Sequence, residues 1–547
     1  MNRIVFLALF LVAALGFNSL IAQQAPPSNW FHLDKSQDGY LGVSTQKLYK
    51  NYINGKQGVK VIVAVIDSGV ETDHEDLKDV LWTNTDEIPN NGKDDDKNGY
   101  IDDIHGWNFL GNAKGENVAF EQMEETRQYL VLKKQFESLD TNNLNKQQQL
   151  DFEQLKDYEN KINAEITEMT EQSFFYQAIA TAAKQLQSKI GKDKITTEDL
   201  TNFKSDQPLF KEVANMMKEI MISESMSYET LIEELESSVK SMKGMLDYGY
   251  NLSFEARSIV GDDPSNFSQI DYGNNDYEGP DAEHGTHVAG IIAATRGNGK
   301  GMDGVANNVE IMVLRAVPDG DERDKDIATA IRYAVDNGAQ IINMSFGKSF
   351  SPYKEELDKA VKYALKKDVL LVHAAGNDNE EVFPTLNFPN DRFVKKGLFG
   401  PKYSDNWITV GALSWKDGEE MVASFSNYSK DHVDVFAPGV KIYSSVIDGG
   451  YSDNDGTSMA APVVSGVAAL LRSYFPDLSA KQVRNILIES AVRQNNTVIQ
   501  PGTEKLVPFS QLSVSGGVVN AVKAFELAQK MKGKLKKNKA LREEIWD

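Results

Sequence analysis

The chain has 547 residues, no cysteine and a formal net charge of −22 at pH 7. Apolar residues make up 41% and charged residues 25%, which excludes wholesale disorder, a collagen-like sequence and a multi-span membrane protein. The acidic balance leaves no large basic patch for phosphates, so we expect no nucleic-acid partner. The absence of cysteine excludes a disulfide scaffold, thiolate catalysis and a Cys-ligated zinc ion.

The first 22 residues have the pattern of a secretory signal peptide. Arg3 supplies a positive charge, residues 4–15 form an apolar run, and Ala22 is a small residue at a cleavage point. The apolar run is short for a membrane span, although an uncleaved anchor is the alternative. We therefore expect an exported protein, periplasmic or extracellular, with no integral membrane span after signal removal.

Apolar runs rich in β-branched residues alternate with helical periods through much of the chain. This alternation is typical of βαβ units and a parallel sheet. The runs are apolar throughout, which fits strands that are covered on both faces. We predict strands at 59–66, 309–314, 340–346, 369–374 and 407–410, and helices at 326–337 and 351–366.

The segment 116–250 differs from its surroundings because it is rich in Glu, Lys, Gln and Asn. It contains two amphipathic runs, a first apolar stripe and a second run at 228–246. We therefore predict an all-helical insertion in the α/β domain. The insertion is either a cap or wall beside the active site, or a stabilising or partner-docking module. Its first apolar stripe consists of Phe152, Leu155, Tyr158, Ile162, Ile166 and Met169.

Two segments bring an aspartate and a histidine to the ends of regular elements. Within residues 61–70, an apolar strand runs directly into Asp67 and is followed by a Gly-containing turn, so this carboxylate is expected at the carboxyl edge of the sheet. Residues 283–294 form an apolar helix with His284 at its start and His287 one turn inside. An aspartate beside a histidine can hold the imidazole tautomer and stabilise the imidazolium.

Two further positions carry groups suited to acyl transfer. Ser458 follows a Gly-Thr turn at the start of an apolar helix, near the positive end of the helix dipole. Taken alone, this position is more typical of a helix cap than of a nucleophile. Asn377 follows an apolar strand, where its amide could donate to an oxyanion; a turn asparagine is the alternative.

Together, the chain order Asp67, His284, Asn377 and Ser458 resembles that of the subtilisin-like serine peptidases, the subtilases of peptidase family S8. Chymotrypsin-like enzymes and α/β-hydrolases have other orders. The resemblance covers roughly 59–104 and 272–524. It implies an α/β fold, a subtilisin-like three-layer sandwich with a mostly parallel central sheet, interrupted here by the all-helical insertion.

The resemblance also implies a role for each catalytic position. Ser458 is expected to be the nucleophile, and His284 the general base and then the general acid. Asp67 is expected to orient His284, whereas His287 is expected to be structural. Asn377 is expected to donate to the oxyanion together with the backbone N–H of Ser458.

The resemblance implies a substrate groove as well. Ser345, Phe346 and Gly347 resemble the substrate-binding strand of the family, which pairs with a peptide backbone by β-augmentation. Residues 317–321 resemble the opposite wall of the groove and are unusually charged here. The charge indicates either a preference for basic residues upstream of the cut or a solvated loop.

An acidic loop that begins at Asp94 is a candidate structural calcium site. No cofactor is expected for catalysis. Position 12 of the loop is His105, where an EF-hand has a glutamate, so Asp103 or a distant carboxylate would have to substitute. The alternative is an acidic turn. Asp76 matches a calcium position of the family, although two basic residues in its partner loop argue against a site there. The loop residues that match calcium-ligand positions are Asp94, Asp96, Asn98 and Asp102.

These observations predict an exported serine endopeptidase that acts on protein or peptide substrates through an acyl-enzyme. A narrow-specificity processing protease and a non-catalytic pseudo-protease that binds partners are the alternatives. The basic tail is expected to be a solvated helix or a frayed end, with partner docking as the alternative. The expected organisation is a signal peptide at 1–22, a first catalytic part at 23–115, the insertion at 116–250, a second catalytic part at 251–524 and a helical tail at 525–547.

Overall fold

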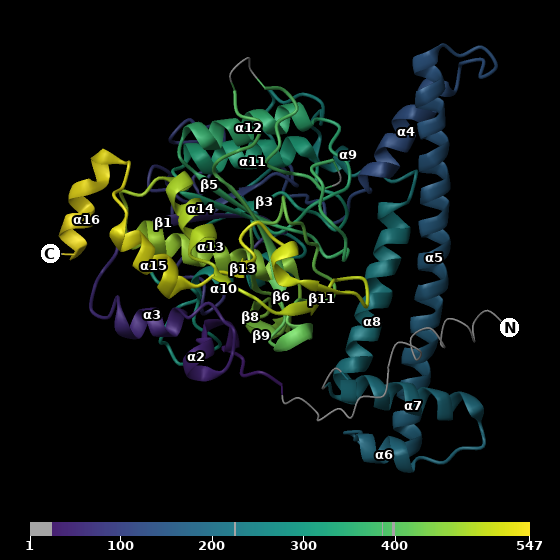
Figure 1. The fold of residues 1–547 in the computed structure, drawn as a ribbon. Coiled ribbons are helices and arrows are strands. Elements are labelled where there is room, and N and C mark those ends of the chain that lie inside the picture. The colour runs from purple at the N-terminus through teal and green to yellow at the C-terminus, as the bar shows by residue number, and fades with distance from the viewer. Residues whose placement is uncertain (1–24, 224–225, 386, 397–399, 547) are drawn as a thin grey trace. The chain divides into compact units, whose positions relative to one another are not determined.

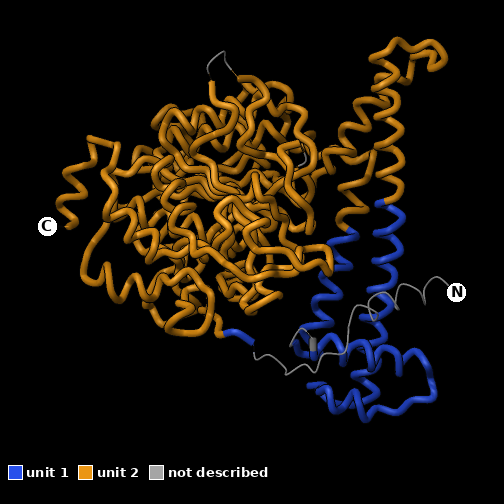
Figure 2. The backbone as a smooth tube through the Cα atoms, viewed as in Figure 1, with its two compact units in different colours: residues 1–26, 165–243 blue, residues 27–164, 244–547 orange. Residues whose placement is uncertain are grey.

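A computed structural model describes residues 25–223, 226–385, 387–396 and 400–546. The predicted signal peptide lies outside the described residues. The described chain forms two compact units, of which unit 1 includes residues 165–243 and unit 2 includes residues 27–164 and 244–546 (Figure 2). No described helix is both long enough and apolar enough to cross a bilayer.

Unit 2 is built on a sheet of nine strands within the described residues, in the order β10-β13-β7-β6-β5-β4-β1-β3-β2 (Figure 1). All neighbouring pairs are parallel except β10 and β13. The strands are β1 (Val61–Asp67), β2 (Gly106–Asn108), β3 (Val309–Arg315), β4 (Ile341–Met344), β5 (Leu370–Ala374), β6 (Trp407–Leu413), β7 (Val435–Pro438), β10 (Val492–Arg493) and β13 (Gly517–Val518).

Apolar residues on both faces of the strands explain why helices cover the sheet on both sides. In β1, Val63 and Val65 belong to one core, whereas Ala64 and Ile66 belong to the other. Successive side chains of a strand point to opposite faces, so a strand that is apolar throughout must be covered on both faces.

Two helical layers complete the sandwich. On one face lie α10 (Glu283–Ala293), α13 (Thr457–Tyr474), α14 (Ala480–Glu489) and α15 (Ala521–Lys530). On the other face, α11 (Asp324–Asp336) and α12 (Lys354–Lys366) lie together (Figure 1). The prediction of an α/β, three-layer sandwich with a mostly parallel central sheet is confirmed.

Shorter elements surround this sandwich. Two antiparallel hairpins pair β8 with β9 and β11 with β12. The remaining elements of unit 2 outside the insertion are η1 (Trp30–His32), α2 (Lys35–Asp38), α3 (Thr45–Asn51), α9 (Arg257–Val260), η3 (Gly418–Glu420), β8 (Ile442–Val446), β9 (Gly450–Asn454), β11 (Thr497–Ile499), β12 (Leu506–Pro508), η4 (Phe509–Gln511), η5 (Lys536–Asn538) and α16 (Lys539–Trp546).

The predicted insertion is helical in both units. Unit 2 contains α4 (Glu124–Phe136), the first part of α5 (Lys146–Ile190) and the π-helical turn η2 (Met245–Gly249). Unit 1 contains the rest of α5 with α6 (Thr197–Asn202), α7 (Pro208–Ser223) and α8 (Tyr228–Gly244). Unit 1 has its own apolar core, in which Met217 and Tyr228 are fully buried and the Tyr228 hydroxyl donates to the Ala183 carbonyl at 2.9 Å.

The tail packs on unit 2. The indole N–H of Trp546 donates to the carbonyl of Tyr474 at 2.9 Å, and its ring stacks on Phe475 with centroids 5.5 Å apart. Arg542 forms an ion pair with Asp477 at 3.0 Å. α16 is therefore not a frayed end, although none of its residues is buried and most of the helix is solvated, as predicted.

Candidate active site

The sheet order brings the predicted site residues to one edge. β1 ends at Asp67, the neighbouring β4 ends just before Ser345, and β5 ends three residues before Asn377. Because β5, β4 and β1 are adjacent and parallel, these three residues share the carboxyl edge of the sheet. The start of α13 reaches the same edge, since the hydroxyl of Ser345 donates to the carbonyl of Ser458 at 2.9 Å.

A tight turn after β1 packs against the start of α10. Gly69 has a φ of +123°, and a Cβ atom there would lie 2.0 Å from the carbonyl of Glu278. A Cβ atom on Gly285 would lie 2.0 Å from the carbonyl of Gly69. Glycine at both positions lets the first turn of α10 lie directly against Asp67.

The aspartate and the histidine are paired. The Nδ1 atom of His284 lies 2.7 Å from Oδ1 of Asp67, so Nδ1–H donates and Nε2 keeps its lone pair. Asp67 is buried, whereas 41% of the His284 side chain is exposed. Burial lowers the pKa of His284, but Asp67, with Asp281 and Glu283, outweighs this effect and raises the pKa above its ordinary value of 6.5.

The second histidine of this helix is placed differently. His287 is fully buried, and its Nε2 atom donates to the carbonyl of Ser452 at 3.2 Å. Burial lowers the pKa of His287 to about 4, so its ring is neutral at neutral pH. This environment fits the structural role expected for His287.

Ser458 lies in the first turn of α13 and is half-buried. Its Oγ atom donates to the carbonyl of Ser345 at 3.2 Å. Within the described residues, the hydroxyl thus bonds to the residue that follows β4 and not to His284. A rotation of the hydroxyl about χ1 is the movement that would direct it to another acceptor.

The amide of Asn377 is held in one orientation. Its Oδ1 atom accepts hydrogen bonds from the backbone N–H and the hydroxyl of Thr457, each at 2.9 Å. The Oγ1 atom of Thr457 in turn accepts from the backbone N–H of Gly376 at 3.1 Å. Because the carbonyl end of the amide is engaged with Thr457, the Nδ2 group of the exposed Asn377 is free to donate elsewhere.

The predicted substrate segment, residues 345–347, follows β4. Ser345 is buried, Phe346 is half-buried and Gly347 is exposed. The Nε2 atom of the buried His373 donates to the carbonyl of Phe346 at 2.8 Å. Burial lowers the pKa of His373 to about 4, so this donor is not lost through a change of charge at neutral pH.

Three residues with contacts in or beside the candidate site were not predicted. Thr457 stands next to Ser458 in the sequence, and a search for donors to Asn377 would have included it. His373 lies four residues before Asn377 in a strand otherwise apolar, and a lone polar residue in such a run is a signal. Lys348 directly follows the predicted substrate segment and is buried. It was missed because some of the residues that surround it belong to distant parts of the chain.

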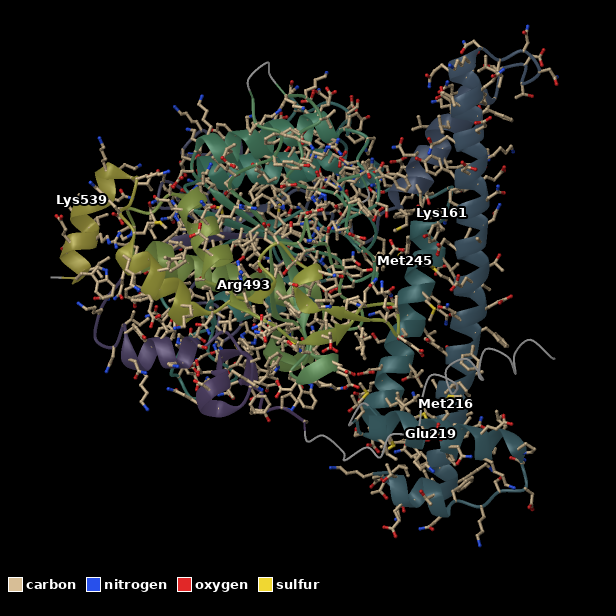
Figure 3. The ribbon with its side chains drawn as sticks, viewed as in Figure 1. Lys161, Met216, Glu219, Met245, Arg493 and Lys539 are labelled. Atoms are coloured by element: carbon tan, nitrogen blue, oxygen red, sulfur yellow. The ribbon has the colours of Figure 1, made fainter. Side chains whose placement is uncertain are left out.

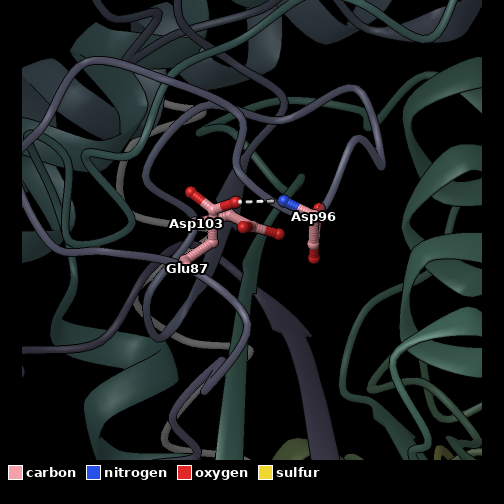
Figure 4. Close-up of side chains that lie close together, drawn as sticks. All are labelled: Glu87, Asp96 and Asp103. Atoms are coloured by element: carbon pink, nitrogen blue, oxygen red, sulfur yellow. Dashed lines mark hydrogen bonds between the residues drawn. The ribbon is translucent and has the colours of Figure 1, made fainter.

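The acidic loop brings three carboxylates together. Oxygen atoms of Glu87, Asp96 and Asp103 lie within 4.8 Å of one another (Figure 4). The Oε1 atom of Glu87 also accepts the backbone N–H of Asp96 at 3.0 Å, the bond drawn in Figure 4. Burial raises the pKa of Asp103 to about 6. Hard oxygen ligands of this kind suit calcium, and one of them, Asp96, belongs to the predicted ligand set.

The other predicted calcium ligands have different partners. Asp94 accepts the backbone N–H groups of Asn98 and Gly99, and Asp102 accepts those of Asn91 and Gly92. The amide nitrogen of Asn98 donates to both Asp96 and Asp103 at 3.1 and 2.9 Å, so this side chain lies beside the carboxylate group.

Asp76 lies in a separate environment from the acidic loop. It accepts hydrogen bonds from Asn298 and from the hydroxyl of Tyr451, the latter at 2.8 Å. The two basic residues of the partner loop have carboxylate partners, because Lys300 pairs with Glu75 and Arg296 pairs with Asp303 at 3.2 Å.

The chain is similar to a known protein family over most of its length. The sequence model of the Subtilase family (peptidase S8) matches residues 58–511. A thermophilic serine proteinase of Bacillus sp. (strain AK1) is 40% identical over 226 residues, which cover 41% of this chain and 49% of the relative, so this chain spans about half of that relative's length.

Subtilisin DY of Bacillus licheniformis is 36% identical over 252 residues, which cover 45% of this chain and 82% of the relative. Among solved structures, a cold adapted subtilisin-like serine proteinase is 30% identical and has a TM-score of 0.33, with 44% of this chain and 72% of that chain covered. The family match spans most of the chain and contains Asp67, His284, Asn377 and Ser458. The chain belongs to the subtilase family.

Proposed function

We propose that this protein is a serine endopeptidase that hydrolyses peptide bonds through the triad Asp67, His284 and Ser458. Membership of the subtilase family and relatives that are serine proteinases support this activity. The observation that carries the assignment of the residues is the 2.7 Å hydrogen bond from His284 to Asp67 at the sheet edge that Ser345 and Ser458 also reach. In this arrangement, Asp67 selects the His284 tautomer that can accept a proton on Nε2.

In the proposed reaction, His284 takes up a proton and gives it back twice. The Ser458 hydroxyl leaves the Ser345 carbonyl, passes its proton to Nε2 of His284, and its oxygen forms a bond to the scissile carbonyl carbon. The C–N bond then breaks, and Nε2–H protonates the departing amine. Water hydrolyses the acyl-Ser458 with His284 again as the base, which returns the serine and releases the acid.

The proposed oxyanion donors are the Nδ2 group of Asn377 and the backbone N–H of Ser458. Support comes from the two hydrogen bonds of Thr457, which hold the amide oxygen of Asn377 and leave its nitrogen available. Charge that develops on the carbonyl oxygen is stabilised best by donors that are already in place.

The proposed substrates are proteins or peptides bound in extended form. Residues 345–347 follow β4, and the exposed Gly347 leaves its backbone accessible for pairing with a substrate strand. Export is proposed from the signal-like pattern of the first 22 residues, with the periplasm and the outside of the cell as the two compartments.

A structural calcium ion is proposed at the acidic loop. The group of Glu87, Asp96 and Asp103 supplies carboxylate oxygens, and Asn98 is next to two of them. An ion would neutralise carboxylates that are otherwise close together, and would stabilise the loop without a part in the reaction.

Covalent labelling by a fluorophosphonate tests the proposed function. We expect labelling of the wild-type protein at Ser458 and none of Ser458→Ala, with hydrolysis of a peptide library by the wild type alone. Labelling without hydrolysis beyond a few sequences would favour the narrow-specificity protease. No labelling of the wild type, or equal labelling of both proteins, would refute the hydrolase and favour a pseudo-protease that binds partners.

A further inference from the structure

The substrate segment 345–347 is followed by a lysine that is buried in an ion-pair cluster. The side chain of Lys348 is 1% exposed, and its Nζ atom donates to Glu124 at 2.9 Å and to the carbonyl of Glu322 at 2.8 Å. It also lies 3.0 Å from Oδ1 of Asp324. A buried ammonium needs such partners, because removal of one leaves an uncompensated charge in a medium of low dielectric constant.

The main partner of this lysine begins the helical insertion. Glu124 is the first residue of α4, and its carboxylate also binds Arg127 at 2.5 Å one turn later. Burial opposes the ionisation of Glu124, but Arg127 and Lys348 together hold its pKa far below the ordinary value. The backbone N–H of Glu124 donates to Asp321 at 2.7 Å, which fixes the start of the helix.

The chain that leads into α4 is attached to the other predicted wall of the groove. Asp319 bonds through its backbone to Ala119 at 2.9 Å and to Glu121 at 2.8 Å, in a parallel bridge. Gly320 has a φ of +120°, and a Cβ atom there would lie 2.1 Å from the Glu121 carbonyl, so only glycine permits this approach. The expectation that this charged segment is a solvated loop is wrong, since Asp321 and the following Glu322 are buried.

Further contacts hold the insertion against the residues after Lys348. Lys161 of α5, labelled in Figure 3, pairs with Glu125 at 2.6 Å and lies 5.4 Å from the ring centre of Phe350. The backbone of Lys348 is itself fixed by two hydrogen bonds with Phe388, at 2.9 and 3.0 Å. Both ends of the segment are thus anchored, by Ser458 at Ser345 and by this cluster at Lys348.

We propose that Lys348 is a positioning residue, whose ion pairs with Glu124 and Asp324 hold residues 345–347 in the geometry that binds an extended substrate. The first helix of the insertion then helps to hold the substrate groove in shape, in addition to being attached to the α/β domain. This inference rests on the proposed function, because it concerns how the same groove recognises its substrate.

The test compares a long and a short substrate. A six-residue peptide p-nitroanilide has to pair with residues 345–347, whereas an N-acetyl amino acid ethyl ester mainly requires the triad. In Lys348→Met, and in the nearly isosteric Glu124→Gln, we expect the ratio of kcat/KM for the peptide to kcat/KM for the ester to fall about tenfold. That loss corresponds to one or two main-chain hydrogen bonds and should arise mainly in KM.

Arg472→Met is the matched control, because it breaks the ion pair of a buried cation with the half-buried Asp368 elsewhere in unit 2. We expect it to leave the ratio at the wild-type value, whatever it does to stability. In the double variant Lys348→Met/Glu124→Gln, the ratio should fall little further than in Lys348→Met, since that change already breaks the contact with Glu124.

Two results would overturn the proposal: an equal loss on both substrates in the two cluster variants, or the same change of ratio in Arg472→Met. If Lys348→Met does not fold, the comparison rests on Glu124→Gln, which keeps the side-chain volume. Failure of the proposed function gives a different result, namely a wild-type protein that a fluorophosphonate does not label and that cleaves neither substrate.

Discussion

The hydroxyl of Thr457 provides a sharp test of how the oxyanion site is organised. It donates one of the two hydrogen bonds that hold the amide oxygen of Asn377, and the backbone N–H of Thr457 donates the other. Thr457→Val removes the first bond, together with the bond that the hydroxyl accepts from the Gly376 N–H, and keeps the second, with almost no change in side-chain volume. The Asn377 amide should then spend part of its time turned away from the reacting carbonyl.

The size of the effect follows from the strength of that bond. A neutral hydrogen bond contributes about 0.5–1.5 kcal/mol, so kcat should fall about 2- to 13-fold. Complete loss of an oxyanion-hole asparagine costs about 10²–10³ in kcat in a subtilisin, and we expect a decrease of kcat of that size in Asn377→Ala. Thr457→Val should therefore lie between the wild type and Asn377→Ala, with KM nearly unchanged.

The assay is kcat for a peptide p-nitroanilide in the wild type, both single variants and the double variant. If the Thr457 hydroxyl acts through Asn377, Thr457→Val should have no further effect once Asn377 is alanine. Thr329→Val is the control, because the Thr329 hydroxyl is also buried and bonds to the Lys325 carbonyl at 2.8 Å, away from the site. A wild-type kcat in Thr457→Val, or an equal loss in the Asn377→Ala background, would refute the reasoning.

Three further predictions concern pH, metal and the tail. Because nearby acids raise the pKa of His284, Asp281→Asn or Glu283→Gln should lower that pKa and move the acid limb of the kcat/KM profile to lower pH; an unmoved limb would contradict this. Calcium should raise the Tm of the wild type by mass action, and EDTA should reverse the rise. Glu87→Gln should abolish this response to calcium. An identical Tm of the wild type with and without calcium would exclude the site. Trp546→Ala should lower the free energy of unfolding in urea by about 1–3 kcal/mol, whereas Lys539→Ala on the same helix should change it by less than about 0.5 kcal/mol; equal effects would argue against tail packing.

The sheet could be predicted where its strands are long and apolar. β1, β3 and β5 lie within one or two residues of their predicted bounds, because runs buried on both faces have an unmistakable composition. β2 (Gly106–Asn108) was missed, since three residues with one tryptophan show neither alternation nor an apolar run. The contact of the tail with unit 2 was not predicted, because a single aromatic residue, Trp546, makes it at the end of a segment rich in lysine.

The site could be predicted only as far as its residues lie in local patterns. Asp67 and His284 each end or begin a regular element, and the structure pairs them across 217 positions of sequence. The proposed role of Lys348 depends on Glu124, 224 positions away, and no local pattern contains both. Glu87 is similar, because it lies outside the loop whose spacing suggested calcium. A partner that comes from another part of the chain can be identified only when the fold is known.

The two ends of the helical insertion meet. The backbone N–H of Met123 and the hydroxyl of Thr126 both donate to the carbonyl of Gly249, each at 2.9 Å. Although the insertion has more than a hundred residues, its two ends are close together, so the α/β sandwich is connected as if by a short loop. Loop-closure entropy grows slowly with length, by about 0.6 kcal/mol per doubling, and is lower still when the inserted chain folds with its ends together. Such a junction lets a lineage lengthen, replace or remove the distal helices while the folding nucleus of the sandwich stays intact, and it marks the place where a foreign domain could be grafted.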